Sequence, residues 1–282
     1  MSPVLPYRGS GEDRPAGLVV PPARMPLLAH GRPLKRWRYV GVFGDRLMLC
    51  AGVVRIGVLP QTFWAVWDRR REALRERTRL VRPLRFVSLP LDGRVVIRDG
   101  TVAADLVVAP GTPVETASQH GPAWIWTRKQ GGVRVTGRVV LDGEPIEVDA
   151  CGCVDESAGY HARETAWEWS AGCGRLTDGR AVAWNLVTGV HDAERGSERT
   201  IWVAGEPVET APVRFAESLD AVEFADGARM TFAGEATRSR TDDLLVFRSD
   251  YVQPFGTFAG TLEGGLELAE GRGVMERHSA LW

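Results

Sequence analysis

Tight-turn dipeptides recur along the chain at short intervals, and they constrain its fold more than any other feature of the sequence. An Asp-Gly or Gly-Gly pair between runs of alternating apolar and polar residues is the strongest short-range signal of a β-hairpin. From Leu84 onward, such pairs separate short apolar runs at Asp92-Gly93, Asp99-Gly100, Gly131-Gly132, Asp142-Gly143, Asp178-Gly179, Asp226-Gly227 and Gly264-Gly265. This spacing is typical of a sandwich or barrel, and no convincing long helix interrupts it. The sequence therefore predicts a mostly antiparallel β fold.

The N-terminal part of the chain has less regular patterns. Residues 1–34 are rich in Pro, Gly and Arg without periodicity, and we expect an extended arm there. Alternating apolar side chains begin at Lys35, and Lys35–Phe43 with Arg46–Ile56 predict a hairpin. The run Thr62–Asp68 fits either a strand or the first turn of a helix. The arginine-rich segment Arg69–Arg82 is the one place where we expect a helix.

One order of elements occurs twice. An aromatic strand, a turn and an apolar strand follow one another in Lys35–Val53 and again in Ala166–Val187. Phe63–Val66 follows the first copy, and Ile201–Ala204 follows the second. Repetition of this kind indicates two β units of comparable plan that divide near residue 150, over residues 35–150 and 151–282.

The totals exclude several classes of partner. A formal net charge of -1 over 282 residues gives no electrostatic case for nucleic acid or an anionic membrane. No apolar run approaches the roughly 20 residues of a membrane span, and the N-terminus does not resemble a signal peptide. We therefore expect a cytoplasmic protein, a monomer or homodimer, whose cysteines are reduced: Cys50, Cys151, Cys153 and Cys173.

The cysteines and histidines give little support for a metal site. A structural zinc site needs two cysteine pairs at defined spacing, and Cys151-Gly152-Cys153 has no second pair. The histidines form no H-x-x-x-H or H-E-x-x-H pattern, and no P-loop, G-x-S-x-G or dinucleotide fingerprint is present. We expect buried, unreactive thiols, no metal and no organic cofactor.

The stretch Asp155–Ser170 concentrates the residues that could carry chemistry. Trp167 and Trp169 are two positions apart, so in a strand both rings share one face and Glu168 takes the other. The residues just before this strand look like a loop that carries Asp155 and His161 toward the aromatic face. Two indoles beside titratable groups fit the wall of a ligand cavity, and they fit a core strand equally well.

Several motifs, in order from about Leu5 to Trp282, resemble a bacterial family of unknown function, DUF2804. They are Lys35-Arg36-Trp37-Arg38-Tyr39, Asp155–His161 with Trp167-Glu168-Trp169, Trp184–Asp192, Ser197-Glu198-Arg199, Ser249–Gly256 and Gly273–His278. More distantly, an Asp followed by a Trp-x-Trp strand is similar to the carotenoid hydratase, AttH and tocopherol cyclase group. That resemblance implies two lipocalin-like (calycin-like) β-barrels or strongly bent sheets with an apolar ligand pocket. It does not imply a reaction.

An acid-catalysed reaction is the chemistry that such a pocket suggests. Adding water to an alkene, or closing a ring on one, needs a proton donor held away from water. The candidates are Asp155, His161, His191, Glu198, Glu276 and His278. Asp155 is the first candidate for the proton donor, and His161 or His191 would be its positioning partner. The faces of the tryptophan rings would stabilise a cation. Alternatively, Asp155 caps a turn and His161 bonds a neighbouring strand.

Two further groups of charged residues are open to two interpretations each. Alternation places Glu276 and His278 on one face of a terminal strand and Arg277 on the other. The strand could thus put an acid and a base into a barrel, or it could be an exposed edge kept soluble by charge. Glu198 could act as a second acid with Arg199 binding a carboxylate or enolate, although a surface ion pair explains these two residues more simply.

Together these patterns predict a protein that binds an apolar lipid-, isoprenoid- or polyketide-like small molecule in a tryptophan-lined β-barrel cavity. A cofactor-independent, acid-assisted hydration, cyclisation or isomerisation is the expected reaction. The expected wall consists of Trp37, Tyr39, Tyr160, Trp167, Trp169, Trp184, Asn185 and Trp202. A carrier that uses the same pocket without chemistry, and a structural or interaction module with a filled core, are the alternatives.

Overall fold

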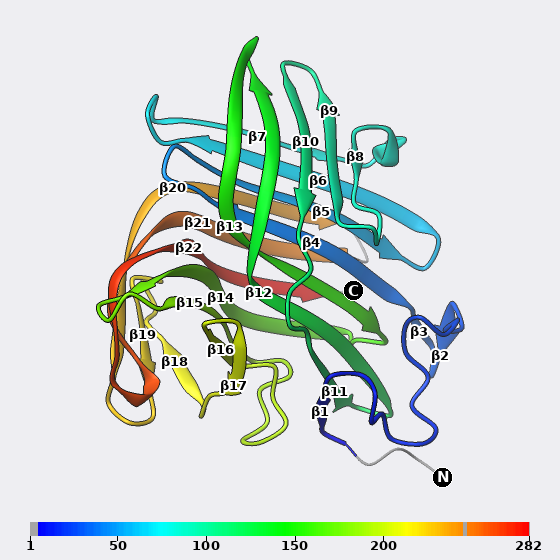
Figure 1. Cartoon of the computed structure of the whole chain (residues 1–282). Coiled ribbons are helices and arrows are strands. Elements are labelled where there is room, and N and C mark those ends of the chain that lie inside the picture. The colour runs from blue at the N-terminus through cyan, green and yellow to red at the C-terminus, as the bar shows by residue number, and fades with distance from the viewer. Residues whose placement is uncertain (1–4, 245–246, 282) are drawn as a thin grey trace.

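The protein folds into two curved antiparallel sheets, seen in a computed structural model that describes residues 5–244 and 247–281 (Figure 1). The first sheet contains β1 (Tyr7–Gly9), β4 (Lys35–Phe43), β5 (Leu47–Ile56), β6 (Leu59–Asp68), β7 (Ala73–Arg79), β8 (Val87–Ser88), β9 (Arg94–Asp99), β10 (Val102–Val108), β11 (Val114–His120), β12 (Ala123–Leu141) and β13 (Glu144–Gly159). The second contains β14 (Glu164–Leu176), β15 (Ala181–Thr188), β16 (Thr200–Val203), β17 (Glu206–Glu209), β18 (Val213–Phe215), β19 (Ala221–Phe224), β20 (Arg229–Leu244), β21 (Phe247–Leu262) and β22 (Leu266–Leu281).

Little else is regular in the part of the chain that the structure describes. β2 (Leu28–Ala29) and β3 (Arg32–Pro33) pair only with each other. Pro83–Arg85 and Glu263–Gly265 form single 3-10 turns, and the described residues contain no α-helix. The expectation of a mostly antiparallel β protein is confirmed. No helix among these residues has the length and apolar character needed to cross a membrane.

The two sheets share one topology. The first runs β7-β6-β5-β4-β13-β12-β10-β9-β8, and the second runs β17-β16-β15-β14-β22-β21-β20-β19-β18. In each sheet the first long strand therefore pairs with the last, β4 with β13 and β14 with β22. The strand orders correspond one to one, with β1 and β11 as an addition to the first sheet. This is the arrangement that the repeated motif predicts.

The change from one sheet to the other lies between Gly159 and Glu164 rather than at residue 150. β13 is a single strand that continues through Ala150 and Cys151, paired with β12 along its length and with β4 over its second half. The expected boundary thus falls inside a strand. The N-terminal arm is likewise partly regular, because β1 pairs with β11.

Most of the turn dipeptides lie where the sequence predicts. Hairpins reverse at Asp99-Gly100, Asp142-Gly143, Asp178-Gly179 and Asp226-Gly227. Gly131-Gly132 is different, because it lies inside β12, where the pairing with β13 shifts register between Gly131 and Val133. Gly132 has a positive φ of 71°. A β-bulge therefore occupies this position, and the strand continues beyond it.

The helix expected over Arg69–Arg82 is wrong. β7 occupies the middle half of this segment as an edge strand paired with β6, and Thr62–Asp68 belongs to β6. The arginines of β7 are held by carboxylates across the sheet, with Arg79 bonded to Asp99 at 2.5 Å. Charged side chains of this kind keep an edge strand from pairing with other chains.

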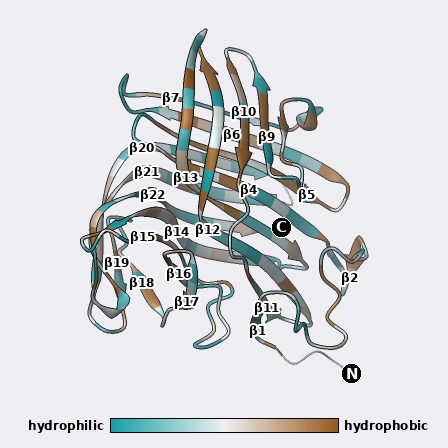
Figure 2. Ribbon diagram, in the orientation of Figure 1, coloured by the Kyte–Doolittle hydropathy of each residue, from teal (hydrophilic) through white to brown (hydrophobic). Residues whose placement is uncertain are grey.

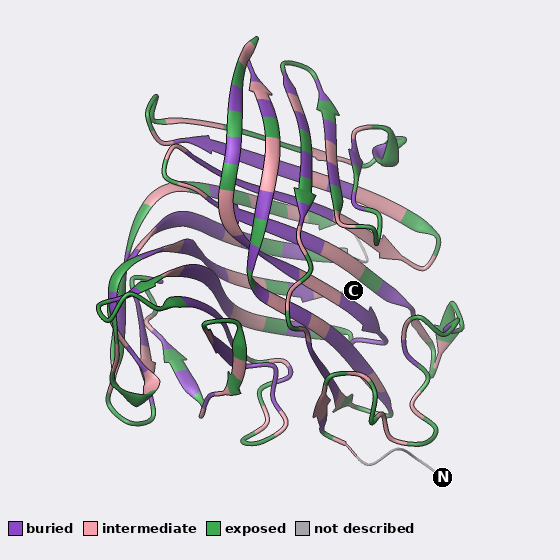
Figure 3. Cartoon of the chain, in the orientation of Figure 1, coloured by how far each residue is buried: buried purple, intermediate pink, exposed green. Residues whose placement is uncertain are grey.

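Four groups of buried apolar side chains fill the molecule, one of them at the junction of the two sheets. Tyr39, Phe43 and Met48 from the first sheet pack there with Trp169 and Phe255 from the second. Buried residues concentrate along the central strands of both sheets, while the turns that connect the strands are largely exposed (Figure 3). Hydropathy alternates along the long strands, as expected for sheets with one covered face (Figure 2). The junction is where the side chains with chemistry gather.

The expectation of four reduced cysteines is wrong for two of them. Cys151 of β13 and Cys173 of β14 form a disulfide, with their Cα atoms 6.4 Å apart. The bond joins the last strand of the first sheet to the first strand of the second. Cys50 and Cys153 are buried free thiols, as predicted, and burial raises the pKa of each to about 12.

Candidate active site

A cavity of about 160 Å³ lies where the two sheets meet, and strands of both sheets contribute to its wall. All six acid and histidine candidates line it: Asp155, His161, His191, Glu198, Glu276 and His278. Of the expected aromatic wall, Trp37, Tyr39, Trp167 and Trp169 also line it. Side chains from distant parts of the sequence are thus brought into one site.

The first sheet contributes a tryptophan bonded to a carboxylate. Trp37 on β4 donates its indole N–H to Oδ2 of Asp155 on β13 at 3.3 Å. Asp155 lies directly opposite Tyr39 in the pairing of these strands. The segment before Gly159 was expected to be a loop, but Asp155 and Ser157 belong to β13, whose alternation turns both toward the cavity.

The second sheet contributes the same arrangement. Trp167 on β14 donates its indole N–H to Oε1 of Glu276 on β22 at 2.7 Å. Glu276 lies directly opposite Trp169. As predicted, Glu276 and His278 share a face that lines the cavity. Arg277 takes the opposite face, where it bonds Glu168 at 2.5 Å.

Asp155 and Glu276 therefore occupy equivalent positions in the two sheets. Each lies on the last strand of its sheet, directly opposite an aromatic residue of the first long strand, Tyr39 or Trp169. Each accepts a hydrogen bond from the tryptophan two positions before that aromatic residue in the sequence. The two donor indoles, Trp37 and Trp167, are nearly parallel, with ring centroids 6.3 Å apart and 12° between their planes. The repeat thus places two tryptophan–carboxylate pairs face to face.

The neighbouring strand distinguishes the two carboxylates. On β12, Lys129 is the pairing partner of Asp155, and its ammonium is 2.8 Å from Oδ1 of Asp155. On β21, the equivalent residue is Gln253, which donates its amide N–H to Oε2 of Glu276 at 2.7 Å. One carboxylate therefore faces a cation, while the other faces a neutral amide.

Lys129 keeps its charge inside the protein. Its side chain is 6% exposed, and it also lies 3.2 Å from Oε1 of Glu198. Burial lowers the pKa of Lys129, but the charges of Asp155 and Glu198 more than offset this and leave the pKa above that of a free lysine. An ammonium fixed between two carboxylates is the stable state of this group.

Glu276 has the opposite environment. It is 7% exposed, and burial raises its pKa to about 7. The bond from Trp167 lowers that pKa, whereas the negative charge of Asp155 raises it further. A carboxyl group with a pKa near 7 is partly protonated at neutral pH and can donate a proton.

The three histidines of the cavity are neutral. Burial lowers the pKa of His278 to about 4 and that of His191 to about 3, and it lowers the pKa of His161 well below the usual range. His278 bonds Ser249 at 2.9 Å, and His191 bonds Ser118 through Nδ1 at 2.8 Å. Nε2 of His191 and Nδ1 of His161 have no hydrogen-bond partner within the part of the chain that the structure describes. These two nitrogens can therefore receive a polar group of a guest.

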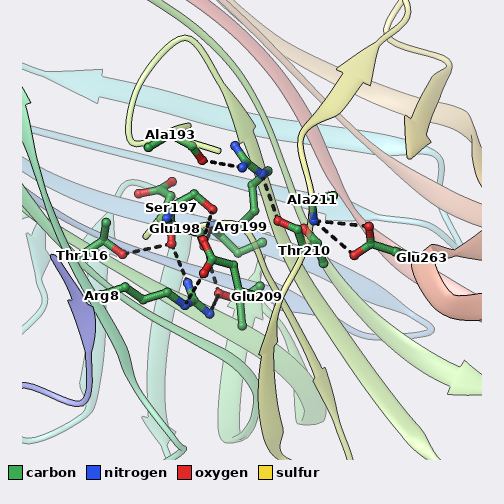
Figure 4. A network of polar contacts seen from close by, with 12 residues as sticks. Arg8, Thr116, Ala193, Ser197, Glu198, Arg199, Glu209, Thr210, Ala211 and Glu263 are labelled. Atoms are coloured by element: carbon green, nitrogen blue, oxygen red, sulfur yellow. Dashed lines mark hydrogen bonds and ion pairs between the residues drawn. The ribbon is translucent and has the colours of Figure 1, made fainter. Parts of the chain in front are cut away.

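Glu198 reaches the cavity from the segment between β15 and β16, which a buried polar network holds in place (Figure 4). Arg199, 1% exposed, donates to the carbonyl oxygens of Asp192 and Ala193 at 2.9 and 2.6 Å. Ser197 donates its hydroxyl to Glu209 at 2.8 Å, and Arg8 donates to the Ser197 carbonyl at 2.6 Å.

The surface ion pair expected for Glu198 and Arg199 is wrong, because both residues are buried and they do not pair with each other. The guanidinium of Arg199 is hydrogen-bonded to main-chain carbonyls, and Arg199 is not among the residues that line the cavity. Its contacts fix the segment from which Glu198 points toward Lys129.

Four of the expected wall residues lie elsewhere. Trp184 is fully buried and donates to Ser170 at 3.1 Å, and Trp202 donates to the carbonyl of Thr112 at 3.0 Å. Tyr160 packs with the N-terminal arm and donates its hydroxyl to Pro26 at 2.7 Å. Asn185 supports the wall from behind, since it accepts the indole N–H of Trp169 at 2.8 Å and donates to the carbonyl of Glu198 at 3.0 Å.

Sequence reasoning missed Lys129, Gln253, Arg238 and Tyr251. Each lies in a long strand where polar and apolar residues alternate. The sequence alone does not distinguish a lysine or arginine that faces a cavity from one that faces solvent. The repeat itself was the signal that could have identified two of them, because Lys129 and Gln253 flank equivalent carboxylates. The described residues contain no group of three or more His, Cys, Asp or Glu that could hold a metal ion.

Comparison with known proteins supports the fold. A family model described as a domain of unknown function, DUF2804, matches residues 110–282. No curated protein matches the chain. The crystal structure of an AttH protein from Nitrosomonas europaea is 17% identical, with a TM-score of 0.53 over 92% of this chain and 98% of that one. Its likeness supports the expected fold of two lipocalin-like β-barrels or strongly bent sheets.

Two further solved structures have TM-scores below 0.5. Kievitone hydratase from Nectria haematococca is 10% identical over 86% of this chain and 88% of that one, with a TM-score of 0.48. CghA in complex with Sch210972 is 9% identical over 88% of each chain, with a TM-score of 0.40.

Proposed function

The chain belongs to the DUF2804 family, a domain of unknown function, and we propose its activity from the chemistry of its cavity. The protein binds an apolar small molecule that contains a carbon–carbon double bond and transfers a proton to it. Hydration, cyclisation or isomerisation of an isoprenoid- or polyketide-like compound follows from that step. No organic cofactor is part of the proposal.

One observation carries the proposal: equivalent carboxyl groups, Asp155 and Glu276, have been given different neighbours. Lys129 places an ammonium 2.8 Å from Asp155, whereas the neutral amide of Gln253 takes the corresponding place beside Glu276. Paired titratable groups whose surroundings differ in this way are typical of an acid and a charged stabiliser in one active site. We therefore assign the proton donor to Glu276 rather than to Asp155, the first candidate from sequence.

In the proposed reaction, the O–H bond of Glu276 breaks and a C–H bond forms at one alkene carbon. The adjacent carbon becomes a cation, and Glu276 becomes a carboxylate. Trp37, Trp167 and Trp169 present indole rings to the cavity, and aromatic faces attract a cation by their negative quadrupole. Asp155 and Glu198 share the single ammonium of Lys129, so the three groups together add a net negative charge at the cavity wall.

Three outcomes complete the reaction. If water attacks, its oxygen bonds to the cation and its proton returns to Glu276, which gives an alcohol. Loss of a neighbouring C–H proton to Glu276 gives an isomer. Attack by a second double bond closes a ring and moves the positive charge to another carbon, and loss of a neighbouring C–H proton to Glu276 then completes the reaction. Nε2 of His191 is buried and unpartnered, and it can accept a hydrogen bond from the attacking water.

Deuterium transfer tests the proposal across a range of candidate substrates. Purified protein is incubated in D₂O with a panel of prenols, prenylated phenols and polyenes, and the products are analysed by mass spectrometry. The wild type is expected to introduce one carbon-bound deuterium into at least one compound. Glu276→Gln, which has the same shape without the acidic proton, is expected to bind that compound and introduce none.

Asp155→Asn is the matched comparison, because it neutralises the equivalent carboxyl. Some deuterium transfer should survive in it, since the acid remains and only charge stabilisation is lost. Transfer that persists in Glu276→Gln and vanishes in Asp155→Asn would move the acid back to Asp155. Binding without any transfer by the wild type would identify a carrier instead.

A further inference from the structure

Arg238 on β20 is a buried cation at the wall of the cavity. It is 4% exposed, and its guanidinium lies over the rings of Phe63 and Tyr251, at 4.3 and 4.7 Å from their centroids. Stacking between two rings holds the planar group in one orientation. A side chain fixed in this way can present its N–H donors to a ligand with little loss of entropy.

Those donors are incompletely used. Nη2 donates to the hydroxyl of Thr78 at 3.1 Å, and the hydroxyl of Tyr251 also interacts with the guanidinium. Nε lies 3.4 Å from a carboxylate oxygen of Glu76 and has no hydrogen-bond partner among the described residues. Glu76 is 36% exposed and is not part of the cavity wall. A guanidinium has five N–H donors in a planar fork that suits two oxygens side by side.

The other cations of the wall are hydrogen-bonded to carboxylates of the protein. Arg240 makes two bonds to Asp242 at 2.5 and 2.6 Å, and Arg38 bonds Glu156 at 2.5 Å. Lys129 lies between two carboxylates, as described above. Arg238 differs from the other lining cations that the structure describes: it lies near a carboxylate, that of Glu76, without a hydrogen bond to it.

We propose that Arg238 binds an anionic oxygen group, a carboxylate or an enolate, at one end of an otherwise apolar ligand. This inference rests on the proposed function and names its substrate class: an unsaturated acid or an acidic enol. The anionic end is held by the fork of Arg238, and the hydrocarbon part extends along the indoles toward Glu276.

Contacts along one wall connect the two ends. The ring of Tyr251 lies edge-on to His278, with centroids 5.2 Å apart, and His278 lies 4.3 Å from Trp167. Trp167 in turn bonds Glu276. Neutral aromatic rings therefore line the wall between the cation and the acid, and they suit a short hydrocarbon chain that joins an anionic group to a double bond.

Binding of a matched pair of ligands tests this inference. Geranic acid and geraniol share one branched hydrocarbon and differ in the carboxylate, and both can be titrated at pH 8 by quenching of tryptophan fluorescence. The wild type is expected to bind the acid at least about 10-fold more tightly, as for hydrogen bonds to a charged group. Arg238→Met should lose this preference and keep its affinity for geraniol within about two-fold.

Arg240→Gln is the control, because it removes the same charge from the same strand. Its preference for the acid should remain, since Arg240 is already paired with Asp242. If Arg238→Met does not fold, Arg238→Lys keeps the charge without the planar fork and should show a reduced preference.

Each outcome is decisive. Equal affinities of the wild type for acid and alcohol would overturn the assignment of Arg238 and leave the apolar-ligand function standing. Retention of the preference in Arg238→Met would also overturn it. Failure of the wild type to bind either compound would contradict the apolar-ligand function itself.

Discussion

Replacement of Lys129 by methionine tests the charge balance of the site. The two side chains have similar stems, so packing against the neighbouring strands is retained while the ammonium is lost. The carboxylates of Asp155 and Glu198 then face each other without a cation. Their side chains are 14% and 3% exposed, so water cannot replace the missing charge effectively.

The expected loss is large for a single substitution. Removing one partner of a buried ion pair costs about 3 to 5 kcal/mol, because an uncompensated charge remains inside the protein. The loss should be near the upper value, because the two carboxylates that lose their cation are only 14% and 3% exposed.

Urea denaturation at pH 8 followed by tryptophan fluorescence measures the free energy of unfolding. Arg134→Met is the matched control on the same strand, since Arg134 and its partner Asp149 are 69% and 62% exposed. Its loss should stay below about 1 kcal/mol. A loss below about 1 kcal/mol in Lys129→Met would refute the account of this ion pair.

Three further predictions follow from the same structure. Glu276→Gln should be more stable than the wild type at pH 8 by up to about 3 kcal/mol, with the difference vanishing below pH 4.5. The sign follows because a pKa raised by burial to about 7 favours folding below the unfolded pKa and loses that contribution as the pH rises through 7. The free energy of unfolding is measured for both proteins between pH 4.5 and pH 8, and the opposite effect of His278, which is present in both, cancels in the difference. A Glu276→Gln variant that is less stable than the wild type at pH 8 would contradict this prediction.

Gln253→Lys should lower the pKa of Glu276 by about 1 to 3 pH units, as a cation beside a carboxyl does, and an unchanged carboxyl titration would count against the assignment. Cys151→Ser should lose about 3 kcal/mol under oxidising conditions only, because the bond to Cys173 closes a segment with a sequence separation of 22. Equal loss with a reductant present would exclude the disulfide as the cause.

Local chemistry made the fold largely predictable. Asp-Gly turns such as Asp99-Gly100 and Asp178-Gly179 fix hairpins, and alternation fixes the faces of the strands between them. Trp167 and Trp169, or Glu276 and His278, could thus be placed on shared faces from their spacing alone. These features depend on neighbours in sequence, so a single chain was enough to derive them.

The remaining errors concern long-range contacts. The arginine-rich β7 has no strand signal of its own, and it is a strand because β6 offers it a paired edge. Cys151 and Cys173 meet because β13 and β14 cross at the junction of the sheets, a geometry that spacing does not reveal. The proposal of Glu276 rather than Asp155 as proton donor also depends on a long-range contact, since Lys129 is distant from Asp155 in the sequence and their contact is made only after the strands pair.

The pairing of the repeats explains why the site looks as it does. Both sheets place an aromatic residue and an acid at the same register, and the cavity forms where these positions meet. A difference of one residue on the adjacent strand, Lys129 against Gln253, then separates a charged carboxylate from one that can hold a proton. The acid–base asymmetry therefore arises from a symmetric scaffold.

Infrared titration of carboxyl groups tests this central claim most directly. The C=O stretch of a protonated carboxyl is followed in the wild type between pH 5 and pH 9, with Glu276→Gln and Asp155→Asn as references. In the wild type we expect a band that disappears as the pH rises, with a midpoint near pH 7. The same band should be missing in Glu276→Gln and present in Asp155→Asn. A wild type without such a band above pH 6, or a band that is lost in Asp155→Asn and kept in Glu276→Gln, would contradict it.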